Sequence, residues 1–106
     1  MDRPRRAEDL LALSAAARRL ADLVAAAEAP LRYEVVRHLL RVSEETMIEV
    51  LEEVVAMRLV RRGADPFTYV PFDAETGAAI RDGLGDERLT RMRSQIDGAA
   101  RRVFGD

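Results

Sequence analysis

One stretch of the chain, residues 43 to 72, constrains the possible fold more than any other. Its first part begins at Ser43, a residue type that caps helices, and then repeats apolar residues at three- and four-residue steps. This pattern predicts an amphipathic helix whose apolar stripe is Met47, Ile48, Leu51, Val54, Val55 and Leu59. Turn formers follow at 63 to 66, and the aromatic and β-branched residues 67 to 72 predict a strand. A helix that leads directly into a short hairpin is the second half of a winged helix-turn-helix, which is the fold we predict.

Two helices are expected before this stretch. Apolar steps predict a helix through most of residues 7 to 28, stopped by Pro30, which cannot continue a helix. The same pattern allows a break at Ser14, which would cap a shorter helix over residues 15 to 28. Residues 31 to 41 predict a second, short helix.

Two more helices are expected after the hairpin. Asp73 is placed to cap a helix to about Asp82, ended by glycines at 83 and 85. Asp86 is placed to cap a last helix to about Phe104. The predicted fold class is therefore mostly α with a small β-hairpin wing, a winged helix-turn-helix flanked by N- and C-terminal helices.

The length of 106 residues predicts one domain with a modest core. We expect residues 1 to 9, which are polar and contain proline, to form a frayed arm, and residues 10 to 106 to form a single winged-helix domain. The chain has no cysteine, its net charge is −2, and no apolar run approaches the ~20 residues of a membrane span. These features predict a cytoplasmic protein with no membrane partner.

The polar side of the helix after Ser43 is acidic, which bears directly on function. It carries Glu45, Glu49, Glu52 and Glu53, with no basic residue between Val42 and Met57. In a winged helix that reads DNA, this side enters the major groove and carries basic or amide side chains. Carboxylates there would be repelled by the phosphates. We therefore predict that these four glutamates dock a protein partner.

Several motifs also resemble those of a known module. They are Leu13-Ser14, Arg18-Arg19-Leu20, Ser43-Glu44-Glu45 and Arg58-Leu59-Val60, with matched positions continuing to about residue 100. The chain resembles the winged helix that follows the nucleotide-binding domain in STAND signal-transduction ATPases, including the large ATP-binding LuxR-type regulators. The resemblance implies a regulatory module that contacts protein and does not read DNA. The family often has a histidine after the hairpin and another in the last helix, where this chain has Asp73 and Arg93.

A weaker resemblance to small MarR- and PadR-like winged-helix regulators keeps an alternative open. In that interpretation the chain is a dimeric transcriptional regulator that holds the DNA backbone with arginines of the arm and the wing, namely Arg3, Arg5, Arg6, Arg58, Arg61 and Arg62.

The two terminal helices are predicted to form an interface. Their apolar stripes are too long for a small winged-helix body to cover, so we expect them to pair in a homodimer or with a host domain. The residues of this predicted interface are Leu13, Leu20, Val24, Met92, Ile96, Val103 and Phe104.

No pattern in the sequence predicts an enzyme, a cofactor, a metal site or a small-molecule ligand. His38, the one histidine, has Glu34 one helical turn before it but lacks a third ligand. Three glutamates on one helix side enclose a divalent cation poorly. The chain also lacks the G-x-x-x-x-G-K-[ST] loop that binds nucleotide phosphates, and no acid and base stand at a catalytic spacing.

Overall fold

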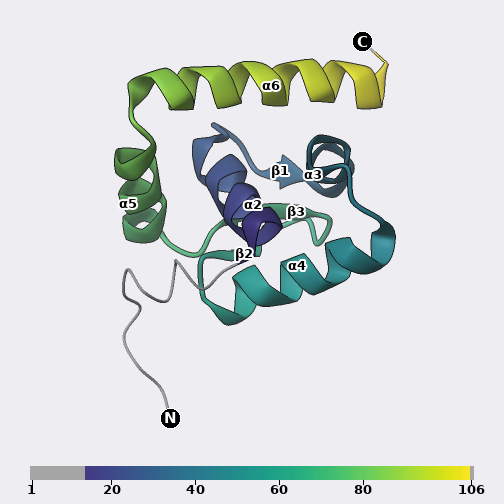
Figure 1. Cartoon of the computed structure of the whole chain (residues 1–106), viewed down its shortest axis with the longest axis horizontal. Coiled ribbons are helices and arrows are strands. Elements are labelled where there is room, and N and C mark those ends of the chain that lie inside the picture. The colour runs from purple at the N-terminus through teal and green to yellow at the C-terminus, as the bar shows by residue number, and fades with distance from the viewer. Residues whose placement is uncertain (1–13, 106) are drawn as a thin grey trace.

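The structure is a computed structural model that describes residues 14 to 105. Within this range the chain is mostly helical and contains a small antiparallel sheet, as predicted (Figure 1). The elements, in order, are α2 (Ala15–Ala26), β1 (Leu31–Arg32), α3 (Tyr33–Leu40), α4 (Glu44–Ala56), β2 (Val60–Arg62), β3 (Thr68–Pro71), α5 (Ala74–Leu84) and α6 (Asp86–Phe104).

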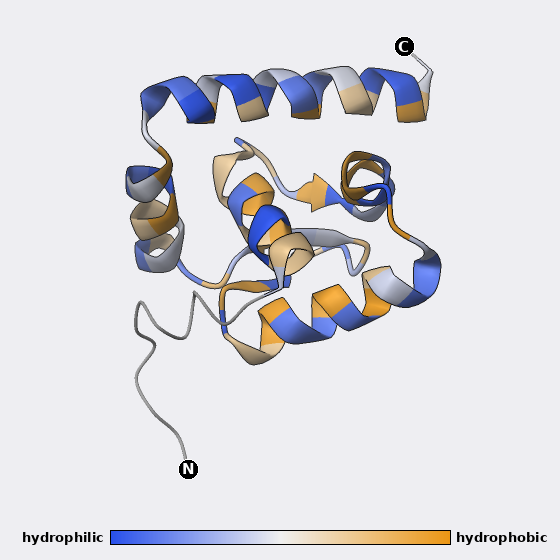
Figure 2. Ribbon diagram, in the orientation of Figure 1, coloured by the Kyte–Doolittle hydropathy of each residue, from blue (hydrophilic) through white to orange (hydrophobic). Residues whose placement is uncertain are grey.

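Helix α2 lies at the centre of the molecule. It contacts α3, α4, α5, α6 and strand β3, and Figure 1 shows the other helices arranged around it. Small and branched apolar residues fill most of its positions, and Leu20, Leu23 and Val24 are almost completely buried. Helix α6 is mostly hydrophilic, and Figure 2 shows its apolar residues on the side that faces the rest of the chain. The core therefore forms around the first described helix.

Three helices begin at caps that the sequence predicts. The side chains of Ser14, Ser43 and Asp73 each accept a hydrogen bond from the backbone N–H three residues later. These caps satisfy N–H groups that have no partner inside the helix.

The cap at Ser14 decides between the two interpretations of the N-terminal pattern. The backbone of Ser14 is extended, so α2 begins at Ala15 and the alternative with a break at Ser14 is confirmed. A continuous helix across Ser14 is wrong, and α2 ends at Ala26, before the predicted end at residue 28. Residues 7 to 13 lie outside the described residues. Asp86 is the first residue of α6, and Gly85 takes the cap position predicted for it.

The sheet has the strand order β1-β3-β2, with both pairs antiparallel. Strands β2 and β3 form the predicted hairpin. The prediction of helix at Leu31 and Arg32 is wrong, because Leu31 lies opposite Tyr69 in the sheet. The N–H of Tyr33 also donates to the Phe67 carbonyl at 2.9 Å. Pairing with a strand far along the chain thus overrides the local preference of this short segment.

Helix α4 buries a different stripe from the predicted one. Met47, Val50 and Val54 are buried, whereas Ile48 and Val55 are exposed, so their assignment to the buried side is wrong. Apolar residues occupy a wide arc of this helix, and α2 and β2 cover only the part centred on Val50 and Val54. A neighbouring element, and not the helical period, therefore selects which edge of the arc is buried.

Helix α4 ends in a tight turn whose middle residue, Arg58, has a left-handed φ of 58°. The N–H of Arg58 donates to the Val55 carbonyl and the N–H of Leu59 donates to the Val54 carbonyl, both at 3.0 Å. This pair of bonds is a Schellman motif, and Leu59, the residue after the left-handed position, is buried. The turn fixes the direction in which the chain leaves α4 for the hairpin.

Candidate functional site

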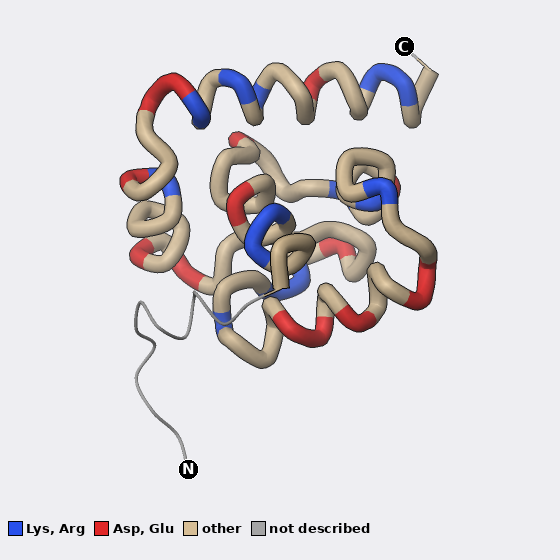
Figure 3. Tube along the Cα trace, viewed as in Figure 1, with Lys and Arg blue, Asp and Glu red and all other residues tan. Residues whose placement is uncertain are grey.

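The outer side of α4 is the first candidate site. Glu45, Glu49 and Glu52 are exposed there, and the exposed Ile48 and Val55 lie on the same side of the helix. Their exposed fractions, 52% and 46%, are high for branched apolar residues. We call these five residues the acidic face. Figure 3 shows acidic residues along α4 and no basic residue between its ends.

Glu53, predicted to belong to the same docking surface, has a different role. One carboxylate oxygen accepts a hydrogen bond from the Ser14 backbone N–H, and the other accepts from the Ser14 hydroxyl, both at 2.9 Å. The Ser14 hydroxyl oxygen also accepts from the N–H of Ala17 at 3.1 Å. Glu53 therefore joins α4 to the first turn of α2, and its carboxylate is occupied within the chain.

The arginines near the hairpin are only partly available to a ligand. Arg61 Nε donates to the Phe72 carbonyl at 3.1 Å, and Arg61 Nη1 donates to the Arg62 carbonyl at 3.2 Å. Arg58 forms part of the turn after α4, and Arg62 is exposed. The arm residues Arg3, Arg5 and Arg6 lie outside the described residues, as does Leu13.

The predicted interface on the terminal helices is largely internal. Leu20, Val24 and Met92 belong to the core of the chain, because α2 and α6 pack against each other. Assigning these three residues to a partner surface is therefore wrong. Ile96 and Val103 are half-buried, whereas Phe104 is exposed and its ring lies 4.7 Å from the guanidinium of Arg32. A central α2 allows one chain to cover both apolar stripes.

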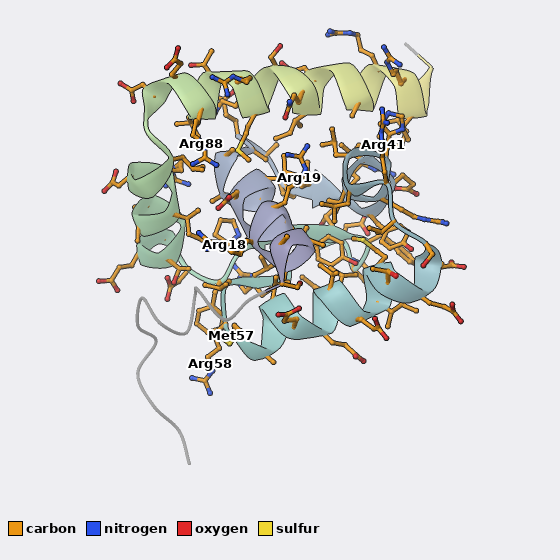
Figure 4. All side chains as sticks on the ribbon, in the orientation of Figure 1. Arg18, Arg19, Arg41, Met57, Arg58 and Arg88 are labelled. Carbon is orange, nitrogen blue, oxygen red and sulfur yellow. The ribbon has the colours of Figure 1, made fainter. Side chains whose placement is uncertain are left out.

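A feature that the sequence does not predict lies where α2, α3 and α6 meet. A recess of about 430 Å³ is lined by three arginines, one histidine and one glutamine, and no Asp or Glu lines it. We call it the basic recess, and its lining residues are Arg19, His38, Leu39, Arg41, Gln95, Gly98, Ala99 and Arg102. Figure 4 shows the side chains of Arg19 and Arg41 on this side of the molecule, away from α4.

Two residues of the basic recess have a side chain, or lack one, in a backbone conformation that disfavours that residue type. Arg41 has φ 56° and ψ 48°, a left-handed conformation that costs about 1–2 kcal/mol for a residue other than glycine. Gly98 lies inside the long helix α6, where glycine costs about 1 kcal/mol relative to alanine. A methyl group at Gly98 would meet no atom within 4 Å, so packing does not require the glycine.

A smaller recess of about 200 Å³ lies between α2, α5 and α6. Arg18, Asp22 and Arg88 line it, together with apolar residues that include Leu59 and Ile80. Burial raises the pKa of the Asp22 carboxyl above its ordinary value, and the positive charges of Arg88, Arg18 and Arg19 partly oppose this rise. Opposite charges therefore line this recess, unlike the basic recess.

Residues 14 to 105 contain neither a cluster of metal ligands nor a membrane-spanning helix. No group of three or more His, Asp or Glu side chains in this range is placed to hold a metal ion. Nor does any helix in the same range have the length and apolar content that crossing a membrane requires. His38 is exposed at the edge of the basic recess.

No family model, curated protein sequence or solved structure matches this chain.

Proposed function

We propose that this chain is a winged-helix module that regulates by binding another protein through the acidic face of α4. The element order supports the winged-helix assignment. Helices α3 and α4 are consecutive and joined by a short turn, and α4 leads into the β2–β3 hairpin. Strand β1, which precedes α3, completes the sheet beside the hairpin. In this assignment α4 occupies the position of a recognition helix.

The composition of the acidic face is the observation that carries the proposal. Glu45, Glu49 and Glu52 place three carboxylates beside Ile48 and Val55 on the one side of α4 that no other element covers. Exposed apolar residues bordered by charges are characteristic of protein-binding surfaces. The complementary partner is a protein surface with an apolar centre and a basic border.

The same face disfavours DNA as the partner. A recognition helix lies within the major groove, close to two rows of phosphates. From Glu44 to Ala56 the helix has only acidic charges, so insertion would cost electrostatic free energy without releasing counterions. The resemblance of the sequence to the winged helix of STAND ATPases agrees with a role in protein contact. We extend the proposal to a non-enzymatic regulatory role on this basis.

The experiment compares two sets of charge reversals. The test variant carries Glu45→Lys, Glu49→Lys and Glu52→Lys, and the control carries Glu75→Lys, Asp82→Lys and Glu87→Lys on the exposed surface of α5 and α6. A partner isolated with the unmodified chain is purified and titrated against all three proteins, and circular dichroism checks that each remains folded. We expect the test variant to lose about a hundredfold or more in affinity and the control to change less than about threefold.

A mobility-shift series on DNA from around the gene provides the opposing outcome. Sequence-dependent DNA binding with nanomolar affinity at about 0.15 M salt would overturn the proposal in favour of the small-regulator interpretation. Equal effects of the two sets of reversals on the purified partner would also overturn it, because the acidic face would then have no special role.

A further inference from the structure

We propose that the basic recess between α2, α3 and α6 binds a small anion that carries two or more phosphate-type groups. This site is separate from the acidic face, and its ligand differs in kind from the protein partner proposed for α4. The inference does not depend on the function proposed above.

The charges of the recess determine the class of ligand. Arg19 comes from α2, Arg41 ends α3 and Arg102 comes from the last turns of α6, so three arginines from separate elements line one recess. No Asp or Glu lines the recess. Asp22, whose carboxyl interacts electrostatically with Arg19, lines the neighbouring recess instead. Guanidinium groups bind phosphate oxygens through paired N–H donors, and His38 and Gln95 supply further donors at the border.

The backbone of the recess provides a second, independent observation. Arg41 stands where the left-handed backbone favours glycine, and Gly98 stands where the helix favours any residue with a side chain. Each exchange would stabilise the fold, and both residues line the same recess. Comparable residues outside the recess are Arg58, in the turn after α4, and Gly83, in α5. Such departures from local preference are typical of functional sites. Arg41 supplies a cation, while Gly98 leaves the α6 backbone open to close approach by a ligand.

The shape of the recess favours a small molecule over the backbone of a nucleic acid. Its volume of about 430 Å³ lies in the ordinary range for small-molecule sites. Nucleic acids are usually bound by basic residues spread along a stripe or a helix face. Here the basic residues line one recess together with the apolar residues Leu39 and Ala99.

The test titrates the purified chain with inorganic pyrophosphate at about 0.15 M salt by isothermal calorimetry. We expect saturable binding with one site per chain. Arg102→Ala should weaken it by about tenfold or more, because one charge-assisted contact is lost. Arg101→Ala is the matched control, since this neighbouring arginine in α6 is exposed outside the recess, and it should change the affinity by less than about twofold.

Two further variants separate a binding role from a purely structural one. Gly98→Ala and Arg41→Gly should each raise the melting temperature, by about 4 to 8 °C, because each removes a local backbone penalty. Both should nevertheless weaken pyrophosphate binding, because the first variant places a methyl group in the open space beside α6 and the second removes a cation. A general loss of structure would instead lower the melting temperature and the affinity together.

Several outcomes would overturn the proposal. They include no saturable binding of pyrophosphate, equal losses in Arg101→Ala and Arg102→Ala, and complete competition by an equal concentration of sulfate. Titration with a short DNA duplex tests whether the recess instead binds the phosphates of a nucleic acid backbone. If the duplex binds, depends on Arg102 and is not displaced by pyrophosphate, the recess recognises a nucleic acid backbone and the small-anion proposal fails.

Discussion

The acidic face and the basic recess differ in the sign of their charge, in their shape and in the number of helices that form them. The acidic face belongs to one helix and is exposed to solvent, with Ile48 and Val55 beside its carboxylates. The basic recess draws its cations from α2, α3 and α6, and Leu39 and Ala99 are among its lining residues. Figure 3 shows only acidic charges along α4, whereas α2 and α6 carry residues of both signs. The net charge of −2 therefore conceals two local fields of opposite sign.

This difference shows how shape and charge together select a ligand. An exposed helix face can contact only a partner that supplies its own complementary surface, such as another protein. A recess lined by residues from three helices can contact a small ligand from more than one side. The following variants test how separate these two regions are, in order of decreasing effect.

The largest expected effect is a difference in unfolding free energy between substitutions on the buried and the exposed side of α4. Met47 is completely buried and Ile48, its neighbour, is exposed. Met47→Ala should lower the free energy of unfolding by about 2–5 kcal/mol, because it removes buried contacts and leaves a cavity. Ile48→Ala should change it by less than about 0.5 kcal/mol. Urea unfolding measures both, and similar costs would mean that Ile48 is not part of an exposed face.

A smaller difference in unfolding free energy is expected between substitutions at Glu53 and at the acidic face. Glu53→Ala removes both hydrogen bonds to Ser14, and we expect a loss of about 1 kcal/mol in unfolding free energy, since these bonds are partly accessible to water. Glu52→Ala removes an exposed carboxylate from the same turn and should have almost no effect on stability. Thermal unfolding of the two variants gives the comparison. A larger loss from Glu52→Ala would contradict the assigned roles.

The smallest effect concerns Asp22, beside the recess of mixed charge. Because burial raises the pKa of its carboxyl, the folded chain binds this proton more tightly than the unfolded chain does. The resulting stabilisation is complete below the unfolded-state pKa, about 4, and is lost as the pH rises through the folded-state pKa. Asp22→Asn should therefore gain stability relative to the unmodified chain between pH 3 and pH 7.

Urea unfolding at a series of pH values measures this gain. Asp82→Asn, at an exposed position in α5, is the matched control. If Asp22→Asn instead becomes relatively less stable as the pH rises, the ionised carboxylate is stabilised by its arginines more than it is destabilised by burial.

Much of the fold follows from local sequence signals. Ser43 and Asp73 specify helix starts that the structure contains, because the side chain and the N–H groups that it caps are adjacent in sequence. Leu31 and Arg32 show the limit of this reasoning. A two-residue strand has no period to detect, and its pairing with Thr68 and Tyr69 depends on contacts far along the chain.

The two candidate sites also differ in whether local sequence signals predict them. The exposure of Glu45, Glu49 and Glu52 could be predicted from the helical period, since all three lie on one helix. The basic recess could not, because Arg19, Arg41 and Arg102 are distant in sequence and only the packing of three helices unites them. Its one local signal is Gly98, a glycine inside a strongly helical segment with no turn to explain it.

The anchoring of α4 has a consequence for binding kinetics. Glu53 attaches the helix to the start of α2, and the turn through Arg58 and Leu59 attaches its end to the hairpin. The helix is thus presented in a single orientation, and a partner meets a surface that is already ordered. Little conformational entropy remains to be lost on association. Substitutions at Ile48 and Val55 should consequently change how long the complex survives far more than how fast it forms.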